Sequence, residues 1–422
     1  MSFETISVIG LGYIGLPTAA MFASRKKKVI GVDVNKLAVD TINLGQIHIV
    51  EPDLDMIVHA AVTEGYLKAV SIPEPADAFL IAVPTPFMPF EDGAIPEPDL
   101  SYIESACNGI AQVLKQGDLV ILESTSPVGA TEQVAQWLAD ARPDLSFPQT
   151  AGEDADINIA HCPERVLPGQ VVRELVENDR VIGGMTAKCS ARAVELYKTF
   201  VQGDCVITNA RTAEMAKLTE NSCRDVQIAF ANELSIICDK LDIDVWELIS
   251  LANRHPRINI LQPGPGVGGH CIAVDPWFIV SKTPSEAKLI HTARLVNDSK
   301  PKWVINKVKL AIADYLIANP EKTAKDITIA CYGLAFKPDI DDLRESPAKE
   351  IVCCIAKTHK GRILVVEPNI QVLPEVLSTL ELVDMQDALE IADLHLVLVD
   401  HKEFKQCKIN TKLLIDTKGI WN

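Results

Sequence analysis

Short apolar runs alternate with helical patterns along the first half of the chain. The runs cover residues 5–10, 29–33, 78–83, 119–123, 157–161 and 180–183. Each run has the length of a β-strand, and amphipathic stretches lie between most of them. Strands that alternate with helices form a mostly parallel sheet with helices on both faces. The pattern therefore predicts a doubly wound α/β domain over residues 1–205.

The middle of the chain follows a helical pattern instead. Residues 212–241 contain neither glycine nor proline, and a helix of that length would span roughly 45 Å. Helical patterning continues over residues 242–253 and returns from Ala287 to about Asn319. A helix this long usually joins domains or packs against a second copy of the chain. We expect a central helical domain over residues 206–305.

Strand-like runs return near the C-terminus, at residues 327–332, 362–366, 394–399 and 413–416. They predict a second, smaller α/β domain over residues 306–422. The expected fold class is therefore α/β, with two Rossmann-like domains joined by a central helical domain that contains one long helix.

The charge of the chain excludes two classes of protein. Its 40 basic and 57 acidic residues give a net charge of −17, which argues against binding to nucleic acid or to an anionic membrane. An anionic substrate would be held by local Lys and Arg side chains and by helix N-termini. The eleven cysteines are irregularly spaced, without CxxC pairs, so neither a disulfide framework nor a zinc site is expected. No signal peptide or membrane span is visible, and we expect a cytoplasmic protein.

A dinucleotide site is predicted near the N-terminus. Gly10, Gly12 and Gly15 form a GxGxxG pattern between a strand and a helix, and Asp33 ends the next strand. Glycines permit a tight turn and close backbone approach, the helix N-terminus binds the pyrophosphate, and the carboxylate accepts hydrogen bonds from ribose hydroxyls. Asp33 favours NAD over NADP because a carboxylate repels a 2′-phosphate. The alternative is a glycine-rich turn that binds no nucleotide.

A cysteine follows the glycine-rich segment Pro-Gly-Pro-Gly-Val-Gly-Gly-His at residues 263–270. Cys271 could attack a substrate carbonyl and hold the product as a thioester. Asp275, four residues later, could orient a water molecule or cap the next segment. The alternative is that Cys271 is a small buried hydrophobic residue, as free cysteines usually are.

Polar residues recur along one face of the long predicted helix. Glu214, Lys217, Asn221 and Arg224 are spaced by 3, 4 and 3 residues, which aligns them. Lys217 and Asn221 could together stabilise an oxyanion, although a solvated polar stripe would show the same spacing. Glu164 follows the run at 157–161, and a carboxylate at a strand end could activate water.

These motifs, in this order, resemble the nucleotide-sugar 6-dehydrogenases over essentially the whole chain. The likeness is carried by the GxGxxG turn, the Thr85 and Thr125 loops, Pro163-Glu164, Lys217 with Asn221, Gly268-Gly-His-Cys271 with Asp275, and Gly333-Leu-Ala-Phe-Lys-Pro-Asp. Within the family, the segments 162–169 and 255–271 are most similar to members that oxidise UDP-N-acetyl-D-mannosamine. Where UDP-glucose-specific members have Phe-Leu and a second glutamate after Pro-Glu, this chain has Arg165-Val166, which points to a different sugar.

The resemblance implies oxidation of a sugar CH₂OH to a carboxylate by two NAD⁺. It assigns catalytic roles to Cys271, Lys217, Asn221, Glu164 and Asp275, and requires no metal. The implied NAD contacts are Gly10, Gly12, Tyr13, Ile14, Gly15, Asp33, Thr85, Thr125, Thr131 and Arg344. The implied UDP-sugar contacts are Arg165, Val166, Lys217, Asn221, Arg224, His255, Arg257, Gly268, Phe336, Lys337 and Lys418. The resemblance also implies a homodimer through the long helix and a pathway to surface polysaccharide such as enterobacterial common antigen.

Two other classes stay open on the sequence. A hydroxyacid dehydrogenase of the 3-hydroxyisobutyrate or 6-phosphogluconate type also combines a Rossmann start with Lys and Asn on a helix. It transfers one hydride and needs neither the cysteine nor the C-terminal domain. A regulatory NAD-binding protein without turnover would not need Lys217, Asn221 and Cys271.

Overall fold

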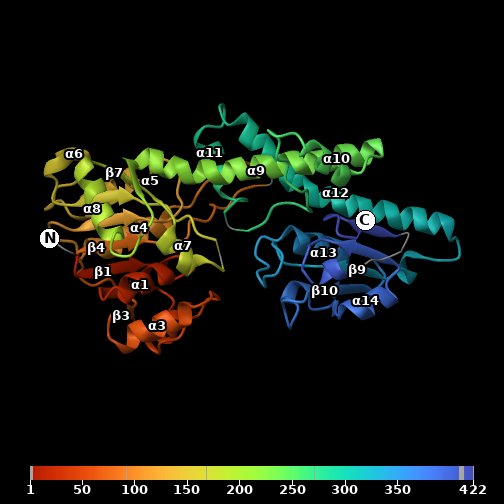
Figure 1. The fold of residues 1–422 in the computed structure, drawn as a ribbon, viewed down its shortest axis with the longest axis horizontal. Helices are drawn as coiled ribbons and strands as arrows, with labels where there is room; N and C mark the ends of the chain where they lie inside the picture. Colours follow the sequence, from red (N-terminus) through yellow and green to blue (C-terminus); the bar gives the residue numbers. More distant parts are fainter. Residues whose placement is uncertain (1–2, 92, 168, 270, 408–412, 422) are drawn as a thin grey trace. The chain divides into compact units, whose positions relative to one another are not determined.

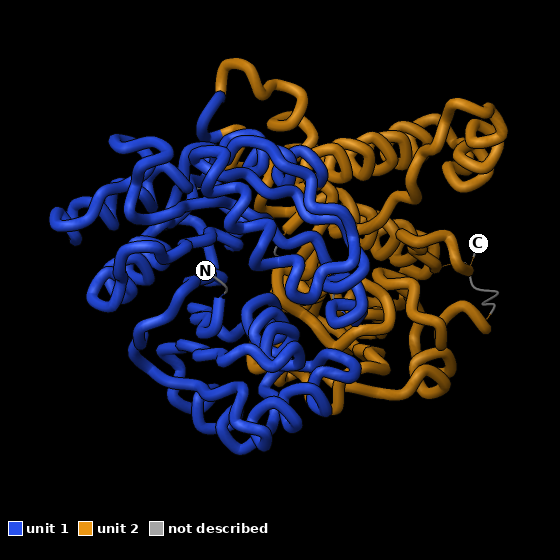
Figure 2. The backbone as a smooth tube through the Cα atoms, turned by 60° about the vertical axis from the view of Figure 1, so that its left-hand side comes forward, with its two compact units in different colours: residues 1–220, 281–283 blue, residues 221–280, 284–422 orange. Residues whose placement is uncertain are grey.

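The computed structural model describes residues 3–91, 93–167, 169–269, 271–407 and 413–421. The chain packs as two compact units, drawn in blue and orange in Figure 2. Unit 1 comprises Met1–Glu220 and Ser281–Thr283, and unit 2 comprises Asn221–Val280 and Pro284–Asn422. The division falls inside the long central helix, which therefore contributes one end to each unit.

Unit 1 is built on an eight-stranded sheet in the order β3-β2-β1-β4-β5-β6-β7-β8 (Figure 1). Neighbouring strands are parallel except β6 and β7. The order reverses between β1 and β4, and ligands bind at such a switch point in doubly wound sheets. The strands are β1 (Thr5–Ile9), β2 (Lys28–Val32), β3 (Leu67–Val70), β4 (Ala78–Ile81), β5 (Leu119–Leu122), β6 (Asn158–His161), β7 (Arg180–Gly184) and β8 (Cys205–Asn209).

The apolar pattern found six of these strands and missed β3 and β8. Both lie at the edges of the sheet, where one side of a strand faces solvent. The exposed Lys68 interrupts the apolar run in β3, and Thr208 and Asn209 end it after three residues in β8, so both strands lack the continuous apolar run of a buried strand.

Helices cover both faces of the eight-stranded sheet, as the alternation predicts. Leu119 and Ile121 of β5 pack in the core formed with α1, α3, α7 and α8. Val120 and Leu122 point the other way, into the core formed with α4 and α5. The helices of unit 1 are α1 (Gly15–Ser24), α2 (Lys36–Asn43), α3 (Leu54–Thr63), α4 (Ser101–Ala111), α5 (Ala130–Ala141), α6 (Pro148–Ala151), α7 (Val171–Glu177) and α8 (Ala187–Tyr197).

The long helix is present as α9 (Ala210–Leu241), with 32 residues. The helical continuation predicted over residues 242–253 is interrupted. Asp242 takes a left-handed φ of 56°, which ends α9, and α10 (Val245–Ala252) starts anew. Asp244 caps α10 by accepting the backbone N–H groups of Trp246 and Glu247. An aspartate that binds the free N–H groups of a first turn favours a new helix over continuation of the old one.

Unit 2 contains a five-stranded parallel sheet in the order β11-β10-β9-β12-β13. Helices α12 and α13 pack on one face, and α14 packs on the other together with Phe404 and Trp421. The strands are β9 (Ile329–Tyr332), β10 (Ile363–Val366), β11 (Glu381–Leu382), β12 (Leu394–Val397) and β13 (Leu414–Asp416). The further helices are α11 (Asp275–Lys282), α12 (Lys288–Ala318), α13 (Pro347–Thr358) and α14 (Met385–Ile391). Two Rossmann-like sheets around a helical segment confirm the predicted fold class.

Candidate active site

The turn after β1 has the shape that the glycine pattern predicts. Gly10 has a φ of +93°, and a Cβ at this position would lie 2.6 Å from the carbonyl oxygen of Ala82. A Cβ on Gly15 would lie 1.8 Å from the carbonyl oxygen of Gly10. A Cβ on Gly12, in contrast, would meet nothing within 4 Å. Two of the glycines therefore allow the turn to close, and Gly12 leaves the backbone open to a ligand.

Asp33 is fixed beside this turn. One carboxylate oxygen accepts the N–H of Leu11 at 2.8 Å, and the other accepts the N–H of Asn35 at 2.8 Å. Asp33 remains partly exposed, so it can also accept from a ribose hydroxyl. Among the described residues, no side chain caps the N-terminus of α1, so no side-chain acceptor occupies the end of the helix where an anion binds. This chain's residues thus fit a dinucleotide.

The loops after β4 and β5 are joined by hydrogen bonds. Thr85 donates its hydroxyl to the carbonyl oxygen of Thr125 at 2.6 Å, and Ser124 donates to the carbonyl oxygen of Val83 at 2.7 Å. Both loops follow strands of the parallel sheet, so they form one rim beside the switch point. The two predicted threonines therefore lie together.

Glu214 is buried and bonded to the start of α5. It accepts the N–H groups of Gly129 and Thr131 and the Thr131 hydroxyl, at 2.6–2.7 Å, and thereby binds the free N–H groups of the first turn. Glu214 therefore does not belong to a solvated stripe of α9. Thr131, a predicted NAD contact, is fully buried, and its hydroxyl donates to Glu214.

Glu164 lies in a buried charged cluster at the end of β6. Arg180 donates from Nη1 to Glu164 Oε2 at 2.6 Å, and both side chains are less than a tenth exposed. Glu164 Oε1 accepts the backbone N–H of Arg165 at 2.7 Å. Glu164 is therefore not an exposed loop acid, because its carboxylate is buried and held on two sides.

A second carboxylate lies behind the same arginine. Glu123 ends β5, and its Oε1 accepts a hydrogen bond from the Tyr197 hydroxyl at 2.5 Å. Burial and the nearby charge of Glu164 raise the pKa of Glu123 to about 7, against the opposing effect of Arg180. Burial raises the pKa of Cys162 to about 12, so this cysteine is a packing residue.

In unit 2 the structure brings Asn221 and Asp275 together. Asn221 Nδ2 donates to Asp275 Oδ2 at 2.5 Å, and Asp275 is buried. Cys271 is exposed, so it is not the buried hydrophobic residue of the alternative interpretation. Its carbonyl oxygen accepts the N–H groups of Val274 and Asp275 at 3.0 and 2.8 Å. This turn leads from Cys271 directly into α11, so the cysteine and the aspartate are held in a fixed relation.

The glycine-rich segment before Cys271 packs against the C-terminal sheet domain. A Cβ on Gly268 would lie 2.3 Å from the carbonyl oxygen of Glu345 and 2.9 Å from Cβ of Phe336. A Cβ on Gly269, which has a φ of +84°, would lie 2.9 Å from the ring of Phe336. Only glycine permits this approach, so the segment and Phe336 form one wall. Further along, the Lys418 amine lies 3.2 Å from Asp400, near Gly264.

The remaining predicted residues are available at the surface or half-buried. Arg165 pairs with Glu220 at 2.8 Å, and Arg344 pairs with Asp342 at 2.7 Å. Val166, Ile14 and Lys217 are half-buried, whereas Tyr13, Arg224, His255, Arg257 and Lys337 are exposed. Pro168 and His270, which belong to two of the motifs, lie outside the described residues.

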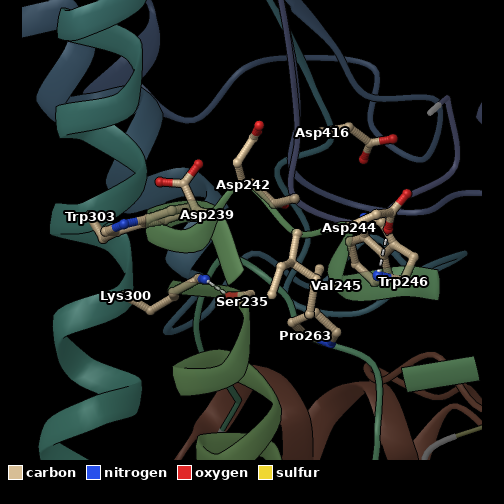
Figure 3. Close-up of a pocket in the computed structure, with 12 residues that line it drawn as sticks. Ser235, Asp239, Asp242, Asp244, Val245, Trp246, Pro263, Lys300, Trp303 and Asp416 are labelled. Carbon is tan, nitrogen blue, oxygen red and sulfur yellow. Dashed lines mark hydrogen bonds between the residues drawn. The ribbon is translucent and has the colours of Figure 1, made fainter. Parts of the chain in front are cut away.

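A pocket of about 390 Å³ lies elsewhere in unit 2 (Figure 3). Lys300 donates to the Ser235 hydroxyl there and lies 4.1 Å from the ring of Trp303. Burial lowers the pKa of Lys300 to about 7. The lining residues are Ser235, Asp239, Asp242, Ile243, Asp244, Val245, Trp246, Pro263, Lys300, Trp303, Asp416 and Thr417. None of them is a predicted site residue.

The described part of the chain contains no cluster of three or more His, Cys, Asp or Glu side chains that could hold a metal ion. Within the same residues, no helix combines the length and the apolar composition needed to cross a bilayer.

Sequence reasoning missed the partners that hold the predicted residues. Arg180 was taken only as the first residue of a strand, although an arginine beginning a buried strand signals a buried carboxylate partner. Asn232, in the middle of α9, was missed as well. Its Oδ1 accepts the N–H of Gly264 at 2.9 Å, which ties the glycine-rich segment to α9. No spacing rule predicts a contact between positions so far apart.

The turn after β1, the open helix N-terminus and the fixed Asp33 define an NAD-dependent dehydrogenase. Three family models match consecutive parts of the chain, as the NAD-binding, central and UDP-binding domains of the UDP-glucose/GDP-mannose dehydrogenase family, at residues 4–201, 211–299 and 330–422. The chain therefore belongs to the UDP-glucose/GDP-mannose dehydrogenase family.

Relatives with known names are similar to this chain over its full length. The chain is 70% identical to a UDP-N-acetyl-D-mannosamine dehydrogenase of Yersinia pestis, covering 100% of both chains. It is 62% identical to an NDP-N-acetyl-D-galactosaminuronic acid dehydrogenase of Ralstonia nicotianae, covering 100% of this chain and 97% of the relative. The solved UDP-D-ManNAc dehydrogenase of Pyrococcus horikoshii superposes with a TM-score of 0.86 at 37% identity, covering 99% of this chain and 96% of the other.

Proposed function

We propose that this chain oxidises C6 of UDP-N-acetyl-D-mannosamine to the carboxylate, using two NAD⁺ and one water molecule. The observation that carries the proposal is Cys271, exposed at the end of the glycine-rich segment in a chain with an NAD-binding domain. A single hydride transfer needs no nucleophile, whereas oxidation from alcohol to acid needs one to hold the aldehyde.

The identity of the sugar is supported by the relatives. The Yersinia and Pyrococcus proteins are both named for the mannosamine sugar. Arg165 and Val166 follow Pro163-Glu164 where UDP-glucose-specific members have Phe-Leu, which is consistent with an acetamido sugar.

Each catalytic residue has a chemical role in this reaction. Bound NAD⁺ supplies the hydride acceptor for both oxidations. Lys217 takes the C6 hydroxyl proton as the first hydride leaves, and with Asn221 it stabilises the developing oxyanion. The Cys271 thiolate adds to the aldehyde and forms a thiohemiacetal, which becomes a thioester when the second hydride leaves. Asp275 orients Asn221 through the hydrogen bond described above.

Hydrolysis completes the reaction. Water adds to the thioester carbonyl, the C–S bond breaks, and its electron pair returns to Sγ of Cys271. Glu164 takes a proton from the attacking water. The products are the uronate and the regenerated thiolate.

Substrate binding would use the basic residues of both sequence halves. Lys418, Lys337, Arg257, Arg224 and Arg165 supply cations for a diphosphate in a chain of net charge −17, and Arg forms paired hydrogen bonds with phosphate oxygens. Phe336, Val166 and Gly268 supply apolar and backbone contacts, and His255 a further polar one. Arg344 would contact NAD, together with Tyr13 and Ile14 of the glycine turn.

We further propose a homodimer that forms through α9. Phe230, Ile237 and Leu241 recur at helical spacing on this helix and are 45–61% exposed. A row of large exposed apolar side chains is typical of an interface. The enzyme would act in the cytoplasm and supply an aminouronic acid for surface polysaccharide of the enterobacterial common antigen type. Size-exclusion chromatography with light scattering tests the dimer, and Ile237→Glu should yield monomers.

Stoichiometry tests the reaction. Purified enzyme with limiting UDP-N-acetyl-D-mannosamine should form about two NADH per sugar, whereas one NADH would indicate a hydroxyacid-type oxidation and none a regulatory protein. Cys271→Ala should bind NAD normally and form no uronate. Normal turnover of Cys271→Ala would rule out the covalent mechanism.

A second substrate is favoured by one observation. The Ralstonia relative, at 62% identity, is named for a galactosaminuronic acid, so the acetamido group is better supported than the sugar stereochemistry. Parallel assays with UDP-N-acetylmannosamine, UDP-N-acetylglucosamine, UDP-N-acetylgalactosamine and UDP-glucose decide between them by kcat/KM.

A further inference from the structure

The buried cluster around Glu164 contains more ionisable groups than the reaction requires. Glu164, Arg180, Glu123 and Tyr197 come from β6, β7, β5 and α8 or from the residues that directly follow these strands, and all are less than a tenth exposed. Burying two carboxylates and one guanidinium is costly unless each charge is compensated. Such a cluster therefore constrains the charge of whichever member faces the substrate.

Arg180 holds Glu164 firmly. Its Nη1 lies 2.6 Å from Glu164 Oε2, and its Cζ lies 5.2 Å from the centre of the Tyr197 ring and 5.9 Å from that of Phe200. These rings fix the arginine, so the arginine fixes the carboxylate. Glu164 Oε1 already accepts the Arg165 N–H, but each carboxylate oxygen has a second acceptor position. A water molecule can therefore still donate to Glu164.

Glu123 is a second carboxylate near the same arginine. It accepts the hydroxyl of Tyr197 at 2.5 Å, and the guanidinium carbon of Arg180 lies 5.2 Å from the centre of that tyrosine ring. The charges of Arg180 and Glu164 have opposite effects on the pKa of Glu123. When Glu123 is charged, it repels the Glu164 carboxylate and competes with it for Arg180. When Glu123 is protonated, Arg180 pairs with Glu164 alone.

The other groups around Glu164 do not supply this control. Burial holds the thiol of Cys162 neutral, with its pKa raised to about 12, and lowers the pKa of His161 to about 3. Burial likewise raises the pKa of Tyr197 well above its usual value. On the outer side, Arg165 is paired with Glu220 of α9. Glu123 is the member whose ionisation falls near neutral pH.

We propose that Arg180 is a positioning residue for thioester hydrolysis, which orients Glu164, and that Glu123 modulates the hydrolysis through this shared arginine. The inference rests on the proposed function of the chain. In the step concerned, water forms the C–O bond, one water proton moves to Glu164, and the C–S electron pair returns to Cys271. Arg180 and Glu123 exchange no atoms with the substrate.

Rapid-quench kinetics of the full-length enzyme test the role of Arg180. With UDP-N-acetyl-D-mannosamine and excess NAD⁺, Arg180→Gln should still release two NADH per site in a burst. Its hydrolysis rate should fall about 100-fold, the lower range for a lost proton acceptor. Mass spectrometry of the quenched protein should then show the sugar acyl group on Cys271. Arg180→Lys, which keeps the charge, should recover part of the rate.

Arg294→Gln is a matched control. Arg294 also forms a buried pair, with Asp225 at 2.6 Å, but it belongs to unit 2 and its side chain bonds to Asp225 and Asp298. Its loss should reduce stability without accumulation of acyl-enzyme. A folded Arg180→Gln enzyme that hydrolyses the thioester at the wild-type rate would overturn the proposal.

Glu123→Gln tests whether Glu123 modulates thioester hydrolysis. This variant also tests the proposal if Arg180→Gln does not fold. Hydrolysis of pre-formed acyl-enzyme is followed from pH 6 to 8.5, so that ionisation of Cys271 does not contribute. The wild-type rate should rise as Glu123 loses its proton near pH 7, and the variant should lack this rise. An unchanged profile would overturn the proposal. A wild-type enzyme without a two-NADH burst would instead contradict the proposed function.

Discussion

The two sheets of this chain begin with the same backbone turn. After β1, Gly10 has a φ of +93° and its N–H donates to Val32 at 2.8 Å. After β9, Gly333 has a φ of +94° and its N–H donates to Val366, also at 2.8 Å. Each unit thus contains a glycine turn of the same conformation, bonded to the end of the neighbouring strand.

Each turn is also held by an acid at the end of the second strand. Asp33 accepts the N–H of Leu11 at 2.8 Å, and Glu367 accepts the N–H of Leu334 at 2.7 Å. Asp33 remains partly exposed, whereas Glu367 is buried and bound by His401 at 3.1 Å. The carboxylate of Asp33 can therefore still accept a hydrogen bond from a ligand, whereas the carboxylate of Glu367 is occupied by hydrogen bonds within its own domain.

The helices after the two turns differ in the same sense. Helix α1 starts at Gly15, directly after the turn, without a side-chain cap among the described residues. Helix α13 starts only at Pro347, and Ser346 caps it by accepting the N–H of Lys349. A Rossmann turn is therefore a structural element first. It becomes a nucleotide site only where the helix N-terminus and the acid stay open.

The largest expected effect is a loss of stability at the turn after β9, which Glu367 holds. Glu367→Ala removes the acceptor of the Leu334 and Ala335 N–H groups and leaves His401 buried without its acid. We expect a loss of about 3–5 kcal/mol, because several buried groups lose their hydrogen-bond partner at about 1–3 kcal/mol each. Asp33→Ala, the matched change in the open turn, should cost about 1 kcal/mol, because water replaces the carboxylate. Urea unfolding followed by tryptophan fluorescence measures both. Equal losses would contradict the distinction between the turns.

Replacing a glycine of each turn by alanine should have the next largest effect, and the effect should differ between the two turns. A Cβ on Gly333 would lie 2.4 Å from Cβ of Val399, so Gly333→Ala should destabilise the protein by about 2–4 kcal/mol through overpacking and left-handed strain. Gly12→Ala meets open space and should leave the melting temperature unchanged. It should instead weaken NAD binding about tenfold or more, measured by titration of protein fluorescence. A stability loss in Gly12→Ala would show that this position is not open.

Cofactor preference should change by a smaller amount. Asp33→Ser removes the charge that repels a 2′-phosphate, so the ratio of kcat/KM for NAD⁺ to that for NADP⁺ should fall about tenfold, which corresponds to roughly 1.4 kcal/mol. Glu367→Gln is the control and should not alter the ratio. An unchanged ratio in Asp33→Ser would refute the assignment of Asp33 to the ribose.

The smallest effect concerns acid stability. Burial raises the pKa of Glu367, but hydrogen bonds from His401 and the Leu334 N–H outweigh it, so the pKa lies below its usual value of 4.5. A lowered folded pKa gives stability that is present above pH 4.5 and is lost as the pH falls through the folded pKa. Glu367→Gln lacks this contribution. The gap in melting temperature between wild type and variant should therefore narrow from pH 6 to pH 3, and a constant gap would contradict the charge of Glu367.

Much of the fold could be predicted because buried parallel strands are apolar throughout. β4, β5 and β10 appear in the sequence as uninterrupted apolar runs, and Ala210–Leu241 as a long stretch without helix breakers. The edge strands β3 and β8 could not be found in this way. The end of α9 at Asp242 was also missed, since its left-handed conformation depends on where α10 begins.

The residues of the candidate site likewise differ in whether the sequence alone could predict them. Gly10, Gly12, Gly15, Asp33 and Cys271 could be found from the sequence because their chemistry depends on residue type at short spacing. Thr131 was assigned to NAD from likeness alone, and the structure gives its hydroxyl to Glu214. Glu164 was placed at a strand end correctly, but its arginine is 16 residues away in the sequence.

The order of residues alone determined the two α/β halves, the long helix and the positions of the reactive groups, because short-range patterns encode them. Only the tertiary structure decided which carboxylates can still bind a ligand and which are buried and bonded to other residues. Asp33 and Glu367 occupy equivalent places, and Glu164 and Glu123 both end strands of one sheet. Their charge and availability are set by partners brought from distant parts of the chain, and burial makes those partners decisive.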